Sequence, residues 1–207
     1  PSDTYDPTSE TELLLQRGLY HLNLFRNLGR QGDFERAANA LQSAIDQQPD
    51  RADGPVGMAL LHNARIVTGA PAADVVPECE KWVQRAMAIQ PRSSKAWAIL
   101  GELETIRRPE QVRRPLEYGL KAAAFGPRDG FAHTRLAGCF MMHSYELSLV
   151  AANEGARLDP LVLDAPIYAA ISLNALNRSD EALSTIRNVL EIEPDTVFGR
   201  LIEALIL

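Results

Sequence analysis

The sequence of 207 residues is poor in the side chains that usually form metal-binding or nucleophilic centres. It has two cysteines, Cys79 and Cys139, and four histidines. No histidine stands at the spacing of a zinc motif such as HExxH, and no CxxC occurs. Both cysteines lie among apolar helix-forming residues, so we expect them to be small buried hydrophobic side chains in a reducing compartment.

Motifs of nucleotide binding and acyl transfer are missing as well. No GxSxG, P-loop or GxGxxG occurs. The carboxylate pairs Glu102/Glu104 and Glu191/Glu193 are each two residues apart, which on a helix directs the two side chains to different faces. Such pairs do not suit shared acid–base chemistry. We therefore expect no enzymatic activity, no metal site and no cofactor.

Excess positive charge, alternating strand patterns and long apolar runs are lacking too. The formal net charge is −6, whereas binding to nucleic acid needs a basic face, so we expect no direct contact with nucleic acid. Runs of Val, Ile and Thr with a period of two are absent, which argues against a sheet. The apolar runs are far too short to cross a bilayer, and we expect no membrane contact.

What the sequence does contain is helical periodicity, most clearly between Pro166 and Pro194. Apolar residues recur three and four positions apart before a polar turn at 177–179 and again after it. Ser179 is the expected N-cap of the second helix, and Pro194 ends that helix because proline lacks an N–H group. Two amphipathic helices cannot bury both apolar faces alone, so similar neighbours are expected.

Those neighbours are marked by prolines at regular intervals. Five helix-like runs each end at a proline, and successive prolines stand 33 to 42 residues apart: Pro49, Pro91, Pro127, Pro160 and Pro194. Self-similarity with this period is typical of a helical solenoid.

The repeats resemble tetratricopeptide repeats (TPRs). The third carries Trp97 followed by Leu100–Gly101, and the first carries Gly32–Asp33 and Ala37 before Pro49. The second and fourth repeats depart from the pattern, with Pro55 and His133 at the usual aromatic positions, and the second has extra residues around 69–74.

The resemblance implies an all-α fold, a right-handed α–α superhelix of about five helix-turn-helix repeats with a C-terminal capping helix. It predicts a linker or frayed N-terminus at residues 1–10 and one domain over 11–207. The expected repeats are 11–49, 50–91, 92–127, 128–160 and 161–194, followed by a cap at 195–207.

The phrase LLLQRGLYHLN, residues 13–23, adds a second resemblance. It is similar to the opening of the TPR region that lies C-terminal to bacterial signalling modules, namely winged-helix regulators, class III adenylate cyclases and protein kinases. The matching residues are Arg17, Gly18, Tyr20 and His21. This resemblance implies an upstream effector domain. Because the sequence starts at Pro1 and not at a methionine, either a tag and leader have been cut away or, as we expect, the chain is part of a longer protein. The expected location is cytoplasmic, or periplasmic if the upstream chain carries a transmembrane helix.

The TPR resemblance also implies that a peptide or protein partner binds a concave groove lined by the first helices of successive repeats. These helices are predicted at about 11–28, 52–68, 94–106, 130–142 and 164–176. The predicted groove residues are Asn23, His62, Asn63, Lys95, Glu102, Thr105, Phe131, Thr134, Met141, Met142 and Asn174. The polar ones suit hydrogen bonding to a peptide, and the apolar ones suit an adaptable pocket. The alternative for the two methionines is core packing.

Four arginines flank Pro109, namely Arg107, Arg108, Arg113 and Arg114. They form either a solvated turn between two helices or a docking point for an acidic peptide or a phosphate.

The last residues, 195–207, predict an amphipathic cap that stays apolar on its outer side, so we expect a homodimer through this helix. Two non-enzymatic functions remain open. The chain is a protein-interaction scaffold, or it is a sensory domain that binds a small molecule in a pocket closed by residues 69–74 and controls an upstream effector.

Overall fold

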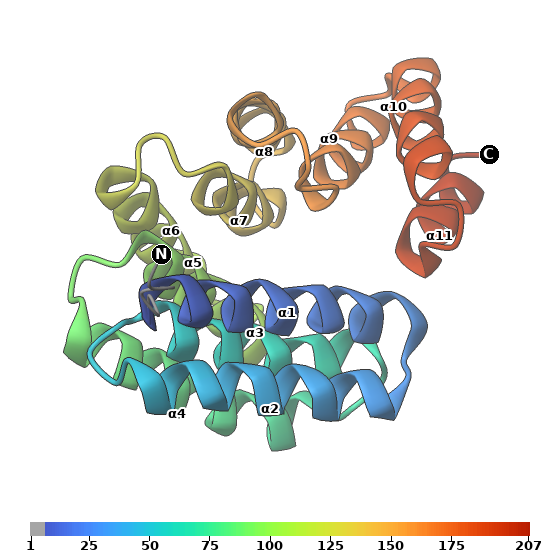
Figure 1. Cartoon of the computed structure of the whole chain (residues 1–207). Coiled ribbons are helices and arrows are strands. Elements are labelled where there is room, and N and C mark those ends of the chain that lie inside the picture. The colour runs from blue at the N-terminus through green and yellow to red at the C-terminus, as the bar shows by residue number, and fades with distance from the viewer. Residues whose placement is uncertain (1–6) are drawn as a thin grey trace. The chain divides into compact units, whose positions relative to one another are not determined.

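The computed structural model describes residues 7–207 of the chain, with side chains from Glu10 onward, and over that range it contains α-helices and no strand (Figure 1). The all-α prediction is confirmed. The helices follow one another as hairpins: α1 (Pro7–Leu28), α2 (Gln31–Gln47), α3 (Asp53–Val67), α4 (Ala72–Ile89), α5 (Ser94–Arg107), α6 (Arg113–Phe125), α7 (Gly130–Met141), α8 (Tyr145–Leu158), α9 (Asp164–Ala175), α10 (Ser179–Ile192) and α11 (Val197–Ile206). None of these helices combines the length and the apolarity needed to cross a membrane.

The described residues form two compact units, one up to residue 91 and the other over 92–207. In the first unit α1 packs on α2 and α3, and α3 packs on α4. Leu41 of α2 is fully buried between glycines of the two neighbouring helices. A Cβ atom added at Gly18 of α1 would lie 2.6 Å from Leu41 Cγ, and one added at Gly57 of α3 would lie 2.5 Å from Leu41 Cδ2. The glycines therefore make room for this side chain between the helices.

A buried carboxylate ties α1 to α2. Asp33, in the first turn of α2, accepts hydrogen bonds at 3.0 Å from the His21 ring and at 3.2 Å from Arg36. The bond from His21, opposed by burial and assisted by Arg36, lowers the pKa of Asp33. His21 and Gly18 both belong to the phrase that resembles signalling proteins. In this structure they make contacts inside the first helical hairpin.

The extra residues of the second repeat do not form a long loop. Only residues 68–71 connect α3 to α4, and Asp74 already lies in the first turn of α4. The additional length is taken up by the helices, because α3 has 15 residues and α4 has 18. Residues 69–74 are therefore too short a loop to serve as a lid over a ligand.

In the second unit, the hairpins α5–α6, α7–α8 and α9–α10 are followed by α11, which packs on α10 and α9. The first helices of the hairpins, α5, α7 and α9, also contact one another in series. Side-chain caps start several helices: Ser93 at α5, Asp129 at α7, Ser144 at α8 and Thr196 at α11.

The turn between α9 and α10 differs from the prediction in one respect. Asn177 takes a left-handed conformation with φ 61°, which asparagine tolerates better than most residues. The N-cap of α10 is Arg178, and Ser179 is the first helical residue. The Ser179 hydroxyl donates to Asn174 Oδ1 at 2.8 Å, so the expected capping by Ser179 is wrong.

Candidate functional site on α5, α7 and α9

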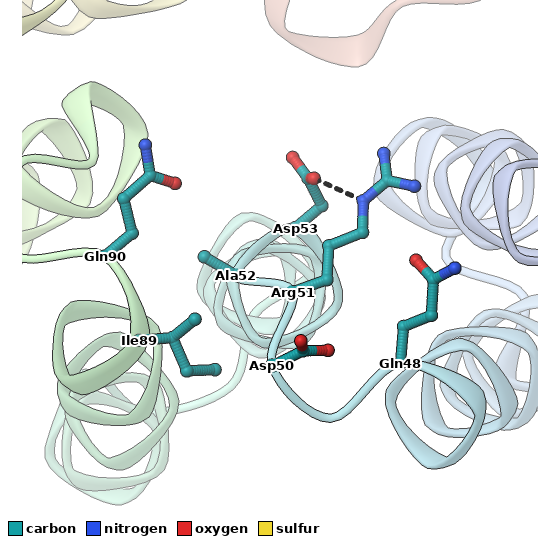
Figure 2. A pocket seen from close by; sticks show the side chains of 7 residues that line it. All are labelled: Gln48, Asp50, Arg51, Ala52, Asp53, Ile89 and Gln90. Carbon is teal, nitrogen blue, oxygen red and sulfur yellow. Dashed lines mark hydrogen bonds and ion pairs between the residues drawn. The ribbon is translucent and has the colours of Figure 1, made fainter. Parts of the chain in front are cut away.

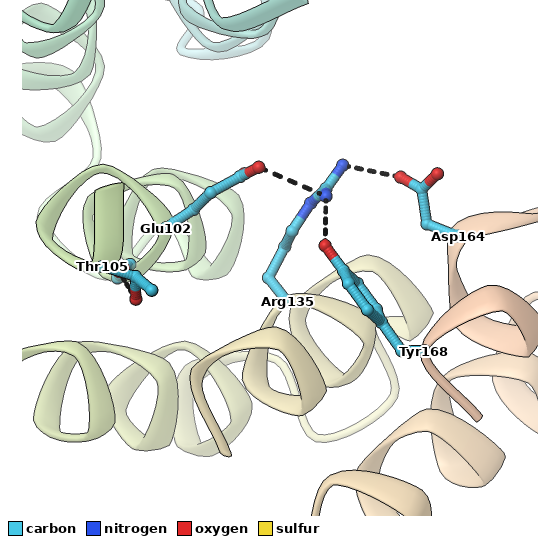
Figure 3. A network of polar contacts seen from close by, with 6 residues as sticks. Glu102, Thr105, Arg135, Asp164 and Tyr168 are labelled. Carbon is cyan, nitrogen blue, oxygen red and sulfur yellow. Dashed lines mark hydrogen bonds and ion pairs between the residues drawn. The ribbon is translucent and has the colours of Figure 1, made fainter. Parts of the chain in front are cut away.

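A buried arginine lies where α5, α7 and α9 meet (Figure 3). Arg135 of α7 is 9% exposed and donates from Nη2 to Asp164 Oδ2 at 2.9 Å. Its Nη1 lies 3.5 Å from Glu102 Oε1 of α5 and 3.4 Å from the Tyr168 hydroxyl of α9. The guanidinium also lies 4.9 Å from the centre of the Phe131 ring. We call these five residues the Arg135 network: Glu102, Phe131, Arg135, Asp164 and Tyr168.

The network fixes its own protonation states. Burial opposes the charge on Arg135, but the carboxylates of Glu102 and Asp164 outweigh it and raise the pKa of the guanidinium. Burial raises the pKa of Tyr168 to about 12, with Arg135 opposing the shift. Arg135 therefore stays charged and Tyr168 stays neutral near pH 7. Two buried atoms, Arg135 Nε and Glu102 Oε2, have no hydrogen-bond partner within the described part of the chain.

The predicted groove residues of the second unit fall into two groups. Glu102 and Phe131 are brought together in the Arg135 network. Lys95 is exposed on α5, which carries Glu102, and Met142 is exposed directly after the end of α7, which carries Phe131. Lys95 precedes Glu102 by seven residues within α5, so the two share a helix face. Met142 is the C-cap of α7.

Other predicted residues are engaged locally. Thr105 donates to the Gly101 carbonyl at 2.9 Å, Asn174 accepts from Ser179, and Met141 is half-buried. Thr134 is fully buried, with its hydroxyl donating to the Gly130 carbonyl at 2.8 Å. It packs where α7 meets α8, because a Cβ atom at Gly155 would lie 2.5 Å from Thr134 Oγ1. Thr134 is therefore not available to a partner in a groove.

The predicted residues of the first unit differ in exposure. Asn23 of α1 is exposed, whereas Asn63 of α3 is 7% exposed and its Oδ1 has no hydrogen-bond partner among the described residues. Asn63 is therefore too buried to offer its amide to a partner as predicted. His62 is half-buried and meets the Phe34 ring edge-on at 5.8 Å.

His62 makes the first unit sensitive to acid. Burial is the main cause that lowers the pKa of His62 below the ordinary value of 6.5. The positive charges of Arg65 and Lys81 lower it further, and the negative charge of Glu78 opposes them. The unfolded chain then binds a proton more readily than the folded chain, so stability is full above pH 6.5 and is lost as the pH falls below it. We expect the urea midpoint to fall between about pH 7.5 and pH 5.5 less steeply in His62→Gln than in the wild type. His143→Gln, at an exposed histidine beyond α7, is the control; an equal slope in both variants would contradict the assignment.

The sequence prediction missed Arg135, Asp164 and Tyr168. Helical spacing carried a signal for each of them, because Arg135 follows Phe131 by four residues and Tyr168 follows Asp164 by four. Each pair stands on one face of a first helix, which is where groove residues are expected. Their mutual contact could not be read from spacing alone.

Three of the four arginines near Pro109 surround a buried carboxylate. Glu104 of α5 has a side chain that is 8% exposed, and three guanidinium groups approach it. The Nη1 atoms of Arg108 and Arg114 lie 3.6 and 3.7 Å from Glu104 Oε1, and Arg107 Nη1 lies 3.9 Å from Oε2. Arg113 is exposed at the first position of α6.

An open depression of about 600 Å³ lies in the first unit, where the α2–α3 connection faces the end of α4 (Figure 2). Its lining is Gln48, Asp50, Arg51, Ala52, Asp53, Ile89 and Gln90. Arg51 already pairs with Asp53 at 2.7 Å and with Glu12 at 2.8 Å, and these bonds raise its pKa. The depression is thus polar and shallow, and its guanidinium is committed to neighbours within the unit.

Both cysteines are buried, as expected from their surroundings in the sequence. Burial, reinforced by Glu102, raises the pKa of Cys139 to about 12, so its thiol is protonated and unreactive near neutral pH. Between residues 7 and 207, no group of three or more His, Cys, Asp and Glu side chains is placed to hold a metal ion.

The C-terminal helix α11 keeps an apolar outer face. Ile202 and Gly199 are buried, while Phe198, Leu201 and Leu205 are exposed. In repeat proteins the terminal element usually presents polar side chains on its outer side. Dimerisation through α11 stays a prediction that this exposed face motivates.

Comparison with solved structures identifies the fold. A thermophilic TPR protein of Thermus thermophilus, TTC0263, is similar with a TM-score of 0.65 and 16% identity, over 91% of this chain and 98% of that chain. PilF of Pseudomonas aeruginosa is similar with a TM-score of 0.56 and 14% identity, over 97% of this chain and 90% of that chain. A chain of the APC/C hetero-tetramer Cut9–Hcn1 is similar with a TM-score of 0.56 and 11% identity, over 96% of this chain and 43% of that chain.

No family model and no curated protein matches the sequence. The predicted TPR fold is confirmed by the structural similarity, which at these identities establishes the fold alone. The resemblance of residues 13–23 to signalling proteins stays a prediction.

Proposed function

We propose that this chain is a non-catalytic interaction module that binds a peptide segment of a partner protein on the face formed by α5, α7 and α9. The observation that carries the proposal is the Arg135 network. It joins three first helices by charged side chains, at the surface where TPR proteins are expected to take their ligands.

The network offers acceptors that are held in place before a peptide arrives. The side chains of Glu102 and Asp164 are each 21% exposed, so they can accept hydrogen bonds from backbone N–H groups or basic side chains of a peptide. Arg135 holds the carboxylates in position, which lowers the entropic cost of binding. The half-buried Phe131 ring adds apolar contact area beside Arg135, and exposed Met142 adds flexible apolar area at the end of α7.

The sensory alternative has less support. A small-molecule site needs an enclosed, mostly apolar pocket. Residues 69–74, which were the candidate lid, form the α3–α4 connection and the first turn of α4. The signalling context, with an upstream effector domain and a cytoplasmic location, stays a prediction that reading the gene upstream of Pro1 would test.

Peptide selection from a random display library against the full chain tests the groove. We expect selected peptides to bind Met142→Asp and Lys95→Glu about tenfold more weakly than the wild type, because both side chains are exposed, Lys95 on the face of α5 that carries Glu102 and Met142 directly after α7. Leu147→Asp on α8 is a matched control, since Leu147 is 50% exposed and Met142 51%. Peptides that bind all three variants equally, or a failure to select any, would contradict the proposal.

A further inference from the structure

We propose a second binding site, at the junction of α5 and α6, that takes the phosphate group of a phosphorylated peptide or protein. The site is the arginine cluster, defined as Arg107, Arg108, Arg113 and Arg114. It uses none of the residues of the Arg135 network, and the proposal does not rest on peptide binding at α5, α7 and α9.

The first argument is that Glu104 assembles the cluster. The Nη1 atoms of Arg107, Arg108 and Arg114 all lie within 3.9 Å of this buried carboxylate. Arg108 and Arg114 each approach it through one nitrogen, whereas a guanidinium has five N–H donors. Neither nitrogen is within hydrogen-bond distance of Glu104 Oε1, so Glu104 Oε1 does not occupy their donors. With Arg113 included, the four arginines exceed the charge of Glu104 by three, on a chain whose net charge is −6.

The second argument is that α6 begins in a way that favours an anion. Its first turn contains no acidic residue, and no side chain caps its N-terminus. Arg113 and Arg114 instead stand at the positive end of the helix dipole, where cations are unfavourable and an anion is stabilised. Because Pro115 has no N–H group, a bound oxyanion would accept from the backbone N–H groups of Arg113 and Arg114 together with guanidinium groups.

The third argument concerns the buried acid itself. Glu104 Oε1 has no partner at hydrogen-bond distance within the described residues, although two guanidinium groups lie 3.6 and 3.7 Å from it. The arginines are thus held near the carboxylate without being locked onto it. A phosphate could therefore engage donors of these arginines that Glu104 does not bind, while their charges stay beside the buried carboxylate. Of the nearby acids, Glu117 is engaged by Lys121 at 2.9 Å and interacts more weakly with Arg113 and Arg114, and Glu110 is exposed in the connection.

The chemistry favours a single phosphate group over a polyanion. A phosphorylated side chain carries nearly two charges and three acceptor oxygens, which several guanidinium forks can share. Nucleic acid binding needs many cationic contacts along a run of phosphates, and an acidic chain with one four-arginine cluster does not supply them. An anionic membrane would repel the rest of the chain, because the chain carries a net negative charge.

The test is an NMR titration of the full 207-residue chain, labelled with ¹⁵N, with a short glycine-rich peptide that carries one phosphoserine. We expect shifts confined to the arginine Nε–Hε groups of the cluster and to the backbone of the α5–α6 junction. The unphosphorylated peptide should bind at least about tenfold more weakly, because charge-assisted hydrogen bonds would be lost. Equal binding of both peptides would overturn the proposal. So would tighter binding of inorganic phosphate, a single-stranded oligonucleotide or phosphatidylserine vesicles at these residues.

Variants separate binding from folding. Arg108→Gln with Arg114→Gln removes two partners of buried Glu104 and is expected to weaken both binding and stability. Arg113→Gln leaves the three arginines around Glu104 in place, so it should fold normally and still bind the phosphopeptide about fivefold more weakly. The matched control is Arg157→Gln with Arg178→Gln, two exposed arginines paired with Glu154 and Glu181. A folded Arg113→Gln with wild-type affinity would contradict the site.

Discussion

Arg135→Met is expected to lower the free energy of unfolding of the second unit by about 3–5 kcal/mol, because breaking a buried ionic network leaves its partners uncompensated. Methionine fills much of the volume of the arginine chain, so the loss reports charge and hydrogen bonding more than a cavity. Glu102 and Asp164 would then stand as two carboxylates near each other without the cation that joins them. Urea unfolding followed by circular dichroism, analysed for separate transitions of the two units, measures the effect.

A cycle of variants separates the ionic network from simple packing. Glu102→Gln with Asp164→Asn removes the charges that Arg135 compensates, so adding Arg135→Met to this pair should cost less than it does in the wild type. The difference should reach about 1–3 kcal/mol for groups in one network. If Arg135→Met costs the same in both backgrounds, the network contributes packing alone.

Leu41→Ala should destabilise the first unit by about 3 kcal/mol, since a large buried side chain is replaced by a cavity. Leu41 is fully buried and fills the space left by Gly18 and Gly57 on either side. Gly57→Ala should also destabilise, by about 1–3 kcal/mol, because its methyl group would overlap a leucine that has no room to move. The free energy of unfolding in urea is the measurement for both variants.

The double variant Leu41→Ala/Gly57→Ala tests the geometry most sharply. The new methyl group would enter the cavity left by Leu41, so the two losses should not add, with a coupling of about 1 kcal/mol or more. Gly32→Ala is the matched control, because a Cβ atom there meets nothing within 4 Å. It should be neutral or slightly stabilising, since alanine favours the helix. Strict additivity in the double variant would show that Leu41 does not occupy the gap at Gly57.

Local interactions explain how much of the fold could be predicted. Apolar residues three and four apart, with prolines and turn residues between them, act within a helical turn or across one hairpin. The predicted first helix at 94–106 corresponds to α5, Ser94–Arg107, for this reason. The prediction at 177–179 found the turn but wrongly assigned the cap to Ser179. A serine hydroxyl can donate to a neighbouring side chain as readily as it accepts from the backbone, and Ser179 donates to Asn174.

The candidate site was predicted only in part. Glu102 and Phe131 were selected because they are polar or aromatic on first helices, and both belong to the Arg135 network. Thr134 was selected on the same basis, yet it is fully buried because α8 comes close to α7 at Gly155. Which side of a helix a neighbour covers depends on the neighbour, and a single helix does not carry that information.

The sequence by itself determined an all-α chain of paired helices, because helical period, turns and proline breaks act over a few residues. Only the tertiary structure decided which charged groups meet. Arg135 reaches Asp164 across 29 residues and Glu102 across 33, and Glu104 gathers arginines from two helices. Such contacts depend on the distances and rotations between packed helices, which the shapes of buried side chains such as Thr134 and glycines such as Gly155 set.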